Sequence, residues 1–380
     1  MRICYVADGS YIHTHRWIRF FHRLGHQVSL ISFQPMDASH VEAVEREGGK
    51  YLGELGAFHV KRFWRTSRSL AWLTRVLRSE QIDVLHCHFI GANTWYAALS
   101  GFHPLVLTVM GGGDVCGPAW TPNGCLAARV MTPLALRRAD LITSWSALMA
   151  RVVQPYSRKG TPVEILHGGV ELTRFHPGPK SNTLRAELRL PAESRVVFSS
   201  RLMRPLSNLH QIAAAAPMVF RNVPEAFFVF GYSSAAKDME YEACVRRIAE
   251  ESGSPERFRF IEQIPHEAMP DFFRLADVTI AIPDYDGTPM SALESMACGT
   301  PVVVGDIPDY DRAYFEPGST VSTARVDDPE SIAAAIVAIF QEPQAARQRA
   351  REAQRRVEDG GSFESQMQRM DRLYKTLKRV

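Results

Sequence analysis

Two carboxylates and a Gly-Thr-Pro turn lie close together in the second half of the chain. Residues 286–290 read Asp-Gly-Thr-Pro-Met after an apolar run, and Glu294 follows four residues later. Proline is favoured just inside a helix start, so this segment predicts a helix whose first N–H groups lack intrahelical partners. Such a helix end binds anions. We therefore predict that a diphosphate is bound by Gly287, Thr288, Pro289 and Met290.

The two acidic side chains are suited to binding hydroxyl groups. Asp286 lies on the loop, and Glu294 lies one turn into the predicted helix, eight residues after Asp286. A carboxylate can accept hydrogen bonds from two hydroxyls at once. We expect one of them to bind a ribose and the other a sugar ring. A capped helix with incidental acidic residues is the alternative.

Arginines follow an earlier apolar run in the same half of the chain. Residues 200–204 read Ser-Arg-Leu-Met-Arg. A leaving diphosphate requires fixed positive charge. We predict that Arg201 and Arg204 supply it, with an ordinary surface charge as the alternative for Arg204.

Polar residues also follow apolar runs in the first half. His86 and His88 alternate on one face of a predicted strand, with His88 nearer its end, while His13 stands in the first loop, near Gly9. We predict that His88 contacts substrate and that Gly9 helps to bind the donor. A lone histidine is more often a satisfied polar group, and this alternative stays open for His88 and His13.

Parallel sheets must position these residues, because apolar runs alternate with helical stripes along the chain. A helical stripe over residues 15–24 ends at Gly25, and another covers residues 363–378. The fold class is therefore α/β with two doubly wound, Rossmann-like domains, which bind ligands in the loops after strands. The predicted strands are residues 2–7, 28–32, 84–86, 105–109, 141–144, 163–166, 195–199, 226–230, 257–261, 278–282 and 301–304.

Chain length also favours two domains, because 380 residues exceed the usual limit for one hydrophobic core. The aperiodic, Gly/Pro-rich stretch 168–179 is the predicted linker. We predict a first domain of residues 1–170, a second of residues 171–360, and a C-terminal helix, 361–380, that returns to the first domain. The two domains are expected to face a central cleft.

Composition excludes several classes of protein. A net charge of +3 is too small to indicate a nucleic-acid partner, and no apolar run approaches the roughly 20 residues of a transmembrane helix. The N-terminus reads as a buried strand and not as a secretory signal, which predicts a cytoplasmic protein. The six cysteines show no C-x-x-C spacing and are expected to be reduced thiols, although Cys116 and Cys125 leave a local disulfide or metal contact open.

Basic and aromatic residues are interleaved in the first 80 residues. Such a segment can lie at an anionic membrane surface, which would make the protein peripheral on the inner face of the membrane. An ordinary amphipathic helix with solvated arginines is an equal alternative. The residues concerned are Arg16, Arg19, Arg23, Lys61, Arg62, Arg65, Arg68, Arg75 and Arg78, with Trp17, Phe20, Phe21, Phe63, Trp64 and Trp72.

Residues 286–304, D-G-T-P-M-S-A-L-E-S-M-A-C-G-T-P-V-V-V, resemble the signature of retaining glycosyltransferases of family 4, which have the GT-B fold. Residues 168–177, G-G-V-E-L-T-R-F-H-P, are similar to the linker of that family. The resemblance covers nearly the whole chain and is closest to a subgroup with D-G-T-P in place of the usual first Glu motif.

The resemblance implies roles for the donor residues. Glu294 would hold the nucleotide ribose, and Asp286 would contact the donor sugar with a shorter arm than the usual Glu. Arg201 matches the family's diphosphate-binding arginine. The family's partner lysine, five residues on, is replaced by Leu206, which leaves Arg204 as the nearest cation.

The resemblance also assigns catalytic positions in the first domain. Many family members have a histidine where this chain has Met110. Asp114 matches an acidic residue found a few positions later, after the triple glycine 111–113. We therefore expect Asp114 to act beside the reacting sugar.

The function implied is transfer of a hexose from a UDP- or GDP-sugar to a glycan or lipid-linked acceptor, in cell-surface polysaccharide or glycoconjugate synthesis. The second domain would bind the donor and the first the acceptor, with no cofactor and no metal required. The D-x-D pattern of Asp284 and Asp286 binds metal in a different glycosyltransferase fold and is discounted here. Alternatives are a nucleotide-sugar epimerase of the same fold and a catalytically impaired scaffold. A dinucleotide oxidoreductase ranks last, because G-x-G-x-x-G is lacking after the first strand.

Overall fold

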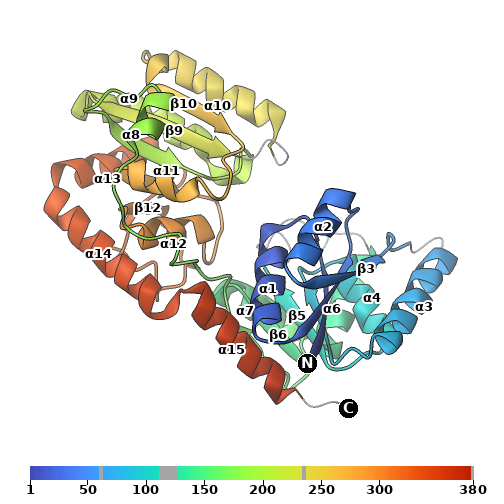
Figure 1. Cartoon of the computed structure of the whole chain (residues 1–380). Coiled ribbons are helices and arrows are strands. Elements are labelled where there is room, and N and C mark those ends of the chain that lie inside the picture. Colours follow the sequence, from blue (N-terminus) through green and yellow to red (C-terminus); the bar gives the residue numbers. More distant parts are fainter. Residues whose placement is uncertain (60–62, 111–125, 233–236, 378–380) are drawn as a thin grey trace. The chain divides into compact units, whose positions relative to one another are not determined.

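The computed structural model describes residues 1–59, 63–110, 126–232 and 237–377 of the chain (Figure 1). The chain folds into two compact units. Met1–Gly168 and Ser365–Val380 form the first unit, and Gly169–Glu364 forms the second.

The first unit is built on a seven-stranded parallel sheet with the order β3-β2-β1-β4-β5-β6-β7. Successive side chains of β1 point to opposite faces, so Cys4 and Val6 join one core layer while Tyr5 joins the other. The strands are β1 (Arg2–Ala7), β2 (Gln27–Ser32), β3 (Gly49–Glu54), β4 (Val84–His88), β5 (Leu105–Val109), β6 (Leu141–Ser144) and β7 (Val163–Ile165).

Helices cover both faces of this sheet. One face packs against α3 (Phe63–Ser79), α4 (Ala92–Ser100), α6 (Leu126–Arg138) and α7 (Ala147–Val153). The other carries α1 (Ile12–Arg23) and the C-terminal helix α15 (Phe363–Thr376). Helix α2 (Ala38–Arg46) leads into β3.

Helix α15 is anchored to the first unit by buried polar contacts. His26 Nε2 lies 2.9 Å from Asp371 Oδ1, and the Tyr374 hydroxyl contacts His86 Nδ1. Met367, Met370 and Tyr374 are fully buried. The predicted return of the C-terminal helix to the first domain is therefore confirmed.

The second unit has a six-stranded parallel sheet with the order β10-β9-β8-β11-β12-β13. Its strands are β8 (Arg195–Ser199), β9 (Ala226–Tyr232), β10 (Phe258–Glu262), β11 (Val278–Ala281), β12 (Val302–Gly305) and β13 (Ser322–Ala324). One core layer contains α9 (Leu209–Asn222), α10 (Met239–Glu251) and α13 (Pro329–Gln341). The other contains α8 (Asn182–Glu187), α11 (Met269–Leu275), α12 (Met290–Ala297) and α14 (Pro343–Gly360).

The predicted linker runs beside the segment that returns to the first unit. Val170 N donates to Gly361 O, and Phe363 N donates to Val170 O, both at 2.8 Å. Gly169 has a φ of +67°, and a Cβ there would lie 2.5 Å from the Cα of Phe363. Glycine is therefore required where the two segments pass each other.

The α/β class with two doubly wound sheets is confirmed, but two edge strands were missed. β3 is only partly buried and β13 has three residues, so neither shows the continuous apolar run of a central strand. β4 is longer than predicted, since pairing with β5 continues to His88. Helix α1 begins at Ile12, three residues before the predicted start, and ends before Gly25 as predicted.

Helix α1 corrects part of the membrane-surface prediction. Trp17 and Phe21 are fully buried, Phe20 is 8% exposed and Arg16 is 3% exposed. Arg19 pairs with Glu47. The aromatic residues of α1 therefore belong to the core, because the helix lies against the sheet.

Candidate functional site

Three neighbouring strands of the second unit bring candidate residues together. β8, β11 and β12 lie side by side, and the loops after them carry Arg201, Asp286 and Tyr310. Asp311 N donates to Gly287 O at 2.9 Å, which joins the last two loops. The carboxyl ends of parallel strands form the ligand-binding edge in folds of this type.

Arg201 and Asp286 form an ion pair at this edge. Arg201 Nη2 donates to Asp286 Oδ2 at 3.1 Å, and Asp286 Oδ1 accepts from Gly287 N at 2.8 Å. The side chains are 20% and 17% exposed. The predicted diphosphate-binding cation therefore contacts the predicted sugar-binding carboxylate directly.

Buried polar atoms lie at the strand ends and on the loops that carry this ion pair. Within the described part of the chain, five of them have no hydrogen-bond partner: Ser199 Oγ, Ser200 Oγ, Arg201 Nε, Thr288 Oγ1 and the Tyr310 hydroxyl. Buried polar atoms in proteins nearly always have partners. A cluster of unpartnered ones is what a site for a polar ligand requires.

Helix α12 begins beside these atoms. Pro289 takes the N-cap position, one residue outside the predicted helical position. Its carbonyl accepts from both Ala292 N and Leu293 N, so the regular helix starts only at Met290. The first N–H groups of α12 begin at Met290, after Pro289, and form a positive helix end on the loop that carries Asp286.

Glu294 is held deeper in the same helix. It is 8% exposed, and its Oε1 lies 3.6 Å from Nε2 of His266, which belongs to the loop between β10 and α11. Arg174 Nη1 lies 2.7 Å from His266 Nδ1. Because a guanidinium only donates, Nδ1 accepts and the ring proton sits on Nε2, facing Glu294.

The loop after β8 also carries Arg204 and Leu206. Arg204 is exposed at the start of a 3₁₀ turn, Pro205–Ser207. Leu206, at the position of the family's lysine, accepts from Asp284 N at 3.0 Å. Asn208 Nδ2 donates to Asp284 Oδ1 at 2.7 Å, so Asp284 and Asp286 have separate partners.

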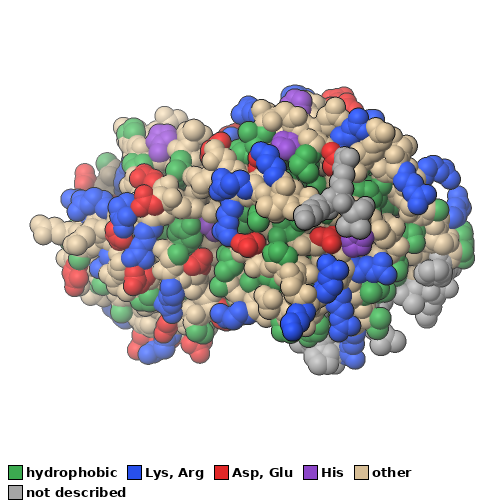
Figure 2. Space-filling view, turned by 90° about the horizontal axis from the view of Figure 1, so that it is seen from below, with side chains coloured by type: hydrophobic (Ala, Val, Ile, Leu, Met, Phe, Trp, Pro, Cys, Tyr) green, Lys and Arg blue, Asp and Glu red, His purple; other side chains and the backbone are tan. Residues whose placement is uncertain are grey.

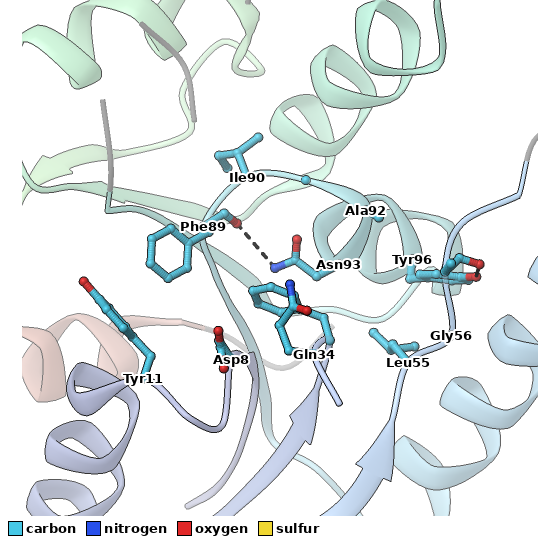
Figure 3. A pocket seen from close by; sticks show the side chains of 13 residues that line it. Asp8, Tyr11, Gln34, Leu55, Gly56, Phe89, Ile90, Ala92, Asn93 and Tyr96 are labelled. Carbon is cyan, nitrogen blue, oxygen red and sulfur yellow. Dashed lines mark hydrogen bonds between the residues drawn. The ribbon is translucent and has the colours of Figure 1, made fainter. Parts of the chain in front are cut away.

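A pocket of about 630 Å³ opens in the first unit (Figure 3). Its wall comes from the loops after β1, β2, β3 and β4, again at the carboxyl ends of parallel strands. Asp8, Gln34 and Asn93 supply polar groups, while Tyr11 and Phe89 supply aromatic faces. The volume is typical of a site for a small molecule.

Asn93 stabilises the wall of this pocket. Phe89 has a φ of +64°, which is uncommon for a residue with a side chain. Asn93 Nδ2 donates to His88 O at 2.7 Å and to Phe89 O at 3.4 Å, and so holds the turn (Figure 3). Strained residues of this kind concentrate at ligand sites.

The first-unit residues predicted from sequence lie outside this pocket. His88 is fully buried between Tyr5 and Trp17, and burial lowers its pKa to about 3. Gly9 packs against Met36, since a Cβ there would lie 2.4 Å from the Met36 sulfur. Asp114 lies outside the described residues.

Sequence reasoning missed several residues of both sites. Each of them follows the carboxyl end of a strand, which is the signal that could have found them. Tyr310 follows β12 and His266 follows β10, while Asp8, Gln34 and Asn93 follow β1, β2 and β4.

Two family matches cover most of the chain. Residues 7–174 match Glycosyltransferase Family 4, and residues 180–357 match Glycosyl transferases group 1. The D-inositol 3-phosphate glycosyltransferase of Thermobispora bispora is 26% identical over 298 residues, which are 72% of this chain and 67% of that protein.

Solved structures share the fold over the full length. Anabaena Alr3699/HepE, determined with UDP and glucose, has a TM-score of 0.83 at 16% identity and covers 99% of this chain and 100% of its own. The sucrose-phosphate synthase of Thermosynechococcus elongatus has a TM-score of 0.77 at 19% identity, with 99% and 98% covered. These likenesses show the GT-B fold.

Proposed function

Because the chain is a glycosyltransferase composed of a Family 4 domain and a group 1 domain, we propose that it moves a hexosyl group from a nucleotide diphosphate sugar to an acceptor hydroxyl with retention of configuration. The observation that carries the donor assignment is the cluster of unpartnered polar atoms around Arg201 and Asp286. The product would serve cell-surface polysaccharide or glycoconjugate synthesis.

The donor is assigned to the second unit. Arg201 and the first amides of α12 are the groups suited to the diphosphate, and Glu294 is suited to the ribose. Alr3699/HepE was determined with UDP and with UDP-glucose, which makes UDP-glucose the first donor to test.

The transfer step is an exchange of two bonds at the anomeric carbon. The bond to the β-phosphate oxygen breaks while the acceptor oxygen bonds on the same face, and the departing phosphate takes the acceptor proton. Negative charge grows on the diphosphate, where Arg201 and the α12 amides lower its free energy. The nucleoside diphosphate leaves as the second product.

The acceptor is assigned to the first-unit pocket. Carboxylate and amide groups of Asp8, Gln34 and Asn93 bind hydroxyls, and the Phe89 and Tyr11 rings offer faces for a sugar ring. A glycan or lipid-linked sugar meets these requirements. Free D-inositol 3-phosphate is a suitable soluble probe, because the relative from Thermobispora bispora is named as a D-inositol 3-phosphate glycosyltransferase.

Turnover measurements with a nucleotide-sugar panel test the function. We expect nucleoside diphosphate release from one donor to depend on an added acceptor, and the new glycoside to keep the donor's anomeric configuration. Epimerisation of the donor sugar in the absence of an acceptor would indicate the epimerase instead. A ligand at 100 times its Kd stabilises the folded protein by about 2.7 kcal/mol. No such stabilisation by any nucleotide sugar in thermal-shift assays would indicate the catalytically impaired scaffold.

Helix α3 supports a membrane-facing role for the first unit. It contains no acidic residue, and its described part exposes Arg65, Arg68, Arg75 and Arg78. None of these four arginines forms an ion pair with a described residue. Trp64 is 56% exposed and lies under the Arg65 guanidinium. Figure 2 shows Lys and Arg side chains gathered at the right of the view, where Figure 1 places α3.

We expect α3 to bind anionic lipid. A basic helix with an exposed tryptophan can lie at the membrane surface. No helix of the described residues is long and apolar enough to span a bilayer. Replacing Arg68, Arg75 and Arg78 with Gln should weaken sedimentation with phosphatidylglycerol-containing vesicles about 100-fold, at about 1 kcal/mol per charge. Transfer to a soluble acceptor should not change.

The matched control removes three arginines from α14, Arg347, Arg349 and Arg351. Vesicle binding should survive this change, because the control variant loses the same charge from the second unit. Equal loss in both triple variants, or equal binding to phosphatidylcholine vesicles, would contradict a specific role of α3.

A further inference from the structure

The carboxylate of Asp286 is already engaged by protein donors on both oxygens. Oδ2 accepts from Arg201 Nη2, and Oδ1 accepts from the amide of the next residue, Gly287. The side chain is short and 17% exposed, so it lies close to its own backbone. This geometry fixes the position of the Arg201 guanidinium, whose Nε still has no hydrogen-bond partner in the described part of the chain.

Tyr310 lies beside this ion pair and offers a hydroxyl to the site. The residue is 5% exposed, and its ring packs on Phe315 with 5.3 Å between centroids. No described residue accepts a hydrogen bond from its hydroxyl, and the nearby Gly305 amide, which lowers the pKa of Tyr310, can only donate, so the hydroxyl proton has no acceptor. Burial raises the pKa of Tyr310 most, and the Asp286 charge raises it further while Arg201 opposes the rise.

The loop that carries Tyr310 is held rigidly to the loop of Asp286. Asp311 N donates to Gly287 O at 2.9 Å, and the two loops follow the paired strands β12 and β11. A buried hydroxyl without a hydrogen-bond partner raises the free energy of the folded protein. Because this hydroxyl is fixed next to a cation, we expect it to gain its hydrogen bond when a polar ligand enters.

The order of the strands indicates where the ribose end and the sugar end of the donor lie. Glu294 contacts His266 from the loop after β10, at one edge of the sheet. Tyr310 follows β12, on the far side of β8 and β11 from β10. A donor whose ribose is held by Glu294 and whose diphosphate is held by Arg201 therefore extends its sugar toward Tyr310.

We propose that the Tyr310 hydroxyl donates a hydrogen bond to the transferred sugar, and that Asp286 is a positioning residue that orients Arg201 toward the diphosphate. This inference rests on the proposed function and changes the role that the family resemblance gives to Asp286. It also explains how an aspartate can replace the longer glutamate at this position, because an aspartate only has to reach Arg201.

Paired binding measurements with UDP and UDP-glucose separate the two roles. Tyr310→Phe should leave the Kd for UDP unchanged and weaken UDP-glucose about five-fold, as expected for the loss of one neutral hydrogen bond. Asp286→Asn should weaken UDP and UDP-glucose by the same factor, about ten-fold, because Arg201 loses its partner. Asp286→Glu, which keeps the charge, should restore most of the binding.

Tyr314→Phe is the matched control. Tyr314 lies four residues further along the same loop and is 7% exposed, but its hydroxyl lies near Gly360 at the end of α14. This variant should bind both ligands as the wild type does. Thermal unfolding confirms that each variant folds, and Asp286→Ala, which also removes the partner of Arg201, replaces Asp286→Asn if the latter does not.

Two results would overturn the inference. If Tyr310→Phe left the Kd for UDP-glucose unchanged, or weakened UDP and UDP-glucose by the same factor, Tyr310 would not contact the sugar. If Asp286→Asn weakened UDP-glucose but not UDP, Asp286 itself would contact the sugar. Failure of the wild type to bind UDP or any nucleotide sugar would instead refute the proposed function, and the variants are not needed to see it.

Discussion

Replacement of Arg201 with alanine should lower kcat/KM for sugar transfer about 100- to 1,000-fold while the protein stays folded. Loss of one fixed donor to developing negative charge costs on this scale in other enzymes. Arg201 is one-fifth exposed and held by Asp286, so its charge is pre-oriented and only partly screened by water. The rate constant of a single turnover at saturating donor measures the chemical step directly.

Two further variants make the Arg201 result specific. Arg201→Lys should recover only part of the activity, because an ammonium ion cannot contact Asp286 and a phosphate in the same planar geometry. Arg204→Ala should cost far less, since Arg204 is exposed at the start of the 3₁₀ turn. Near-normal turnover by Arg201→Ala, or equal losses for Arg201 and Arg204, would contradict the assignment.

Removal of the Glu294 carboxylate should weaken donor binding about 100-fold. The carboxylate is 8% exposed and is suited to accept from two ribose hydroxyls, each worth about 1.5–3 kcal/mol as a charge-assisted hydrogen bond. Glu294→Ala should therefore raise the Kd for UDP and UDP-glucose equally. Isothermal titration calorimetry of both ligands measures this effect.

A deoxy donor tests whether the ribose is the partner of Glu294. The wild type should bind 2′-deoxy-UDP-glucose more weakly than UDP-glucose, whereas Glu294→Ala should bind the two alike. Glu294→Gln is the matched variant, because it keeps one acceptor oxygen and the size of the side chain. Continued discrimination against the deoxy donor by Glu294→Ala would show that another residue binds the ribose.

The fold could be predicted from the sequence because its signals are local. Central strands of a parallel sheet are apolar on both faces, so β1, β5, β6 and β8 were predicted with their observed bounds. The edge strands β3 and β13 face solvent on one side and lack that signal. The stripe on α15 predicted a buried face, since helical periodicity alone determines which residues share a side.

The donor-binding segment could likewise be identified from the sequence. Residues 286–294 combine a turn, a helix start and two carboxylates within a single loop and helix, so their proximity follows from chain connectivity. Arg201 could be named as a candidate because it follows a recognisable strand. Its contact with Asp286 spans 85 residues and could not be predicted.

Tertiary structure alone decided which residues complete the two sites. Tyr310 joins Arg201 and Asp286 because β12, β11 and β8 are neighbours in the sheet, an order that differs from their order in the chain. His88 carried a chemical signal in the sequence, yet the packing of α1 over β4 buries it among aromatic rings. Strand order and helix packing depend on contacts between distant residues, and these place Asp8, Gln34 and Asn93 around one pocket. The sequence by itself thus determined the elements and the donor motif, while the three-dimensional order of the strands selected the side chains that meet.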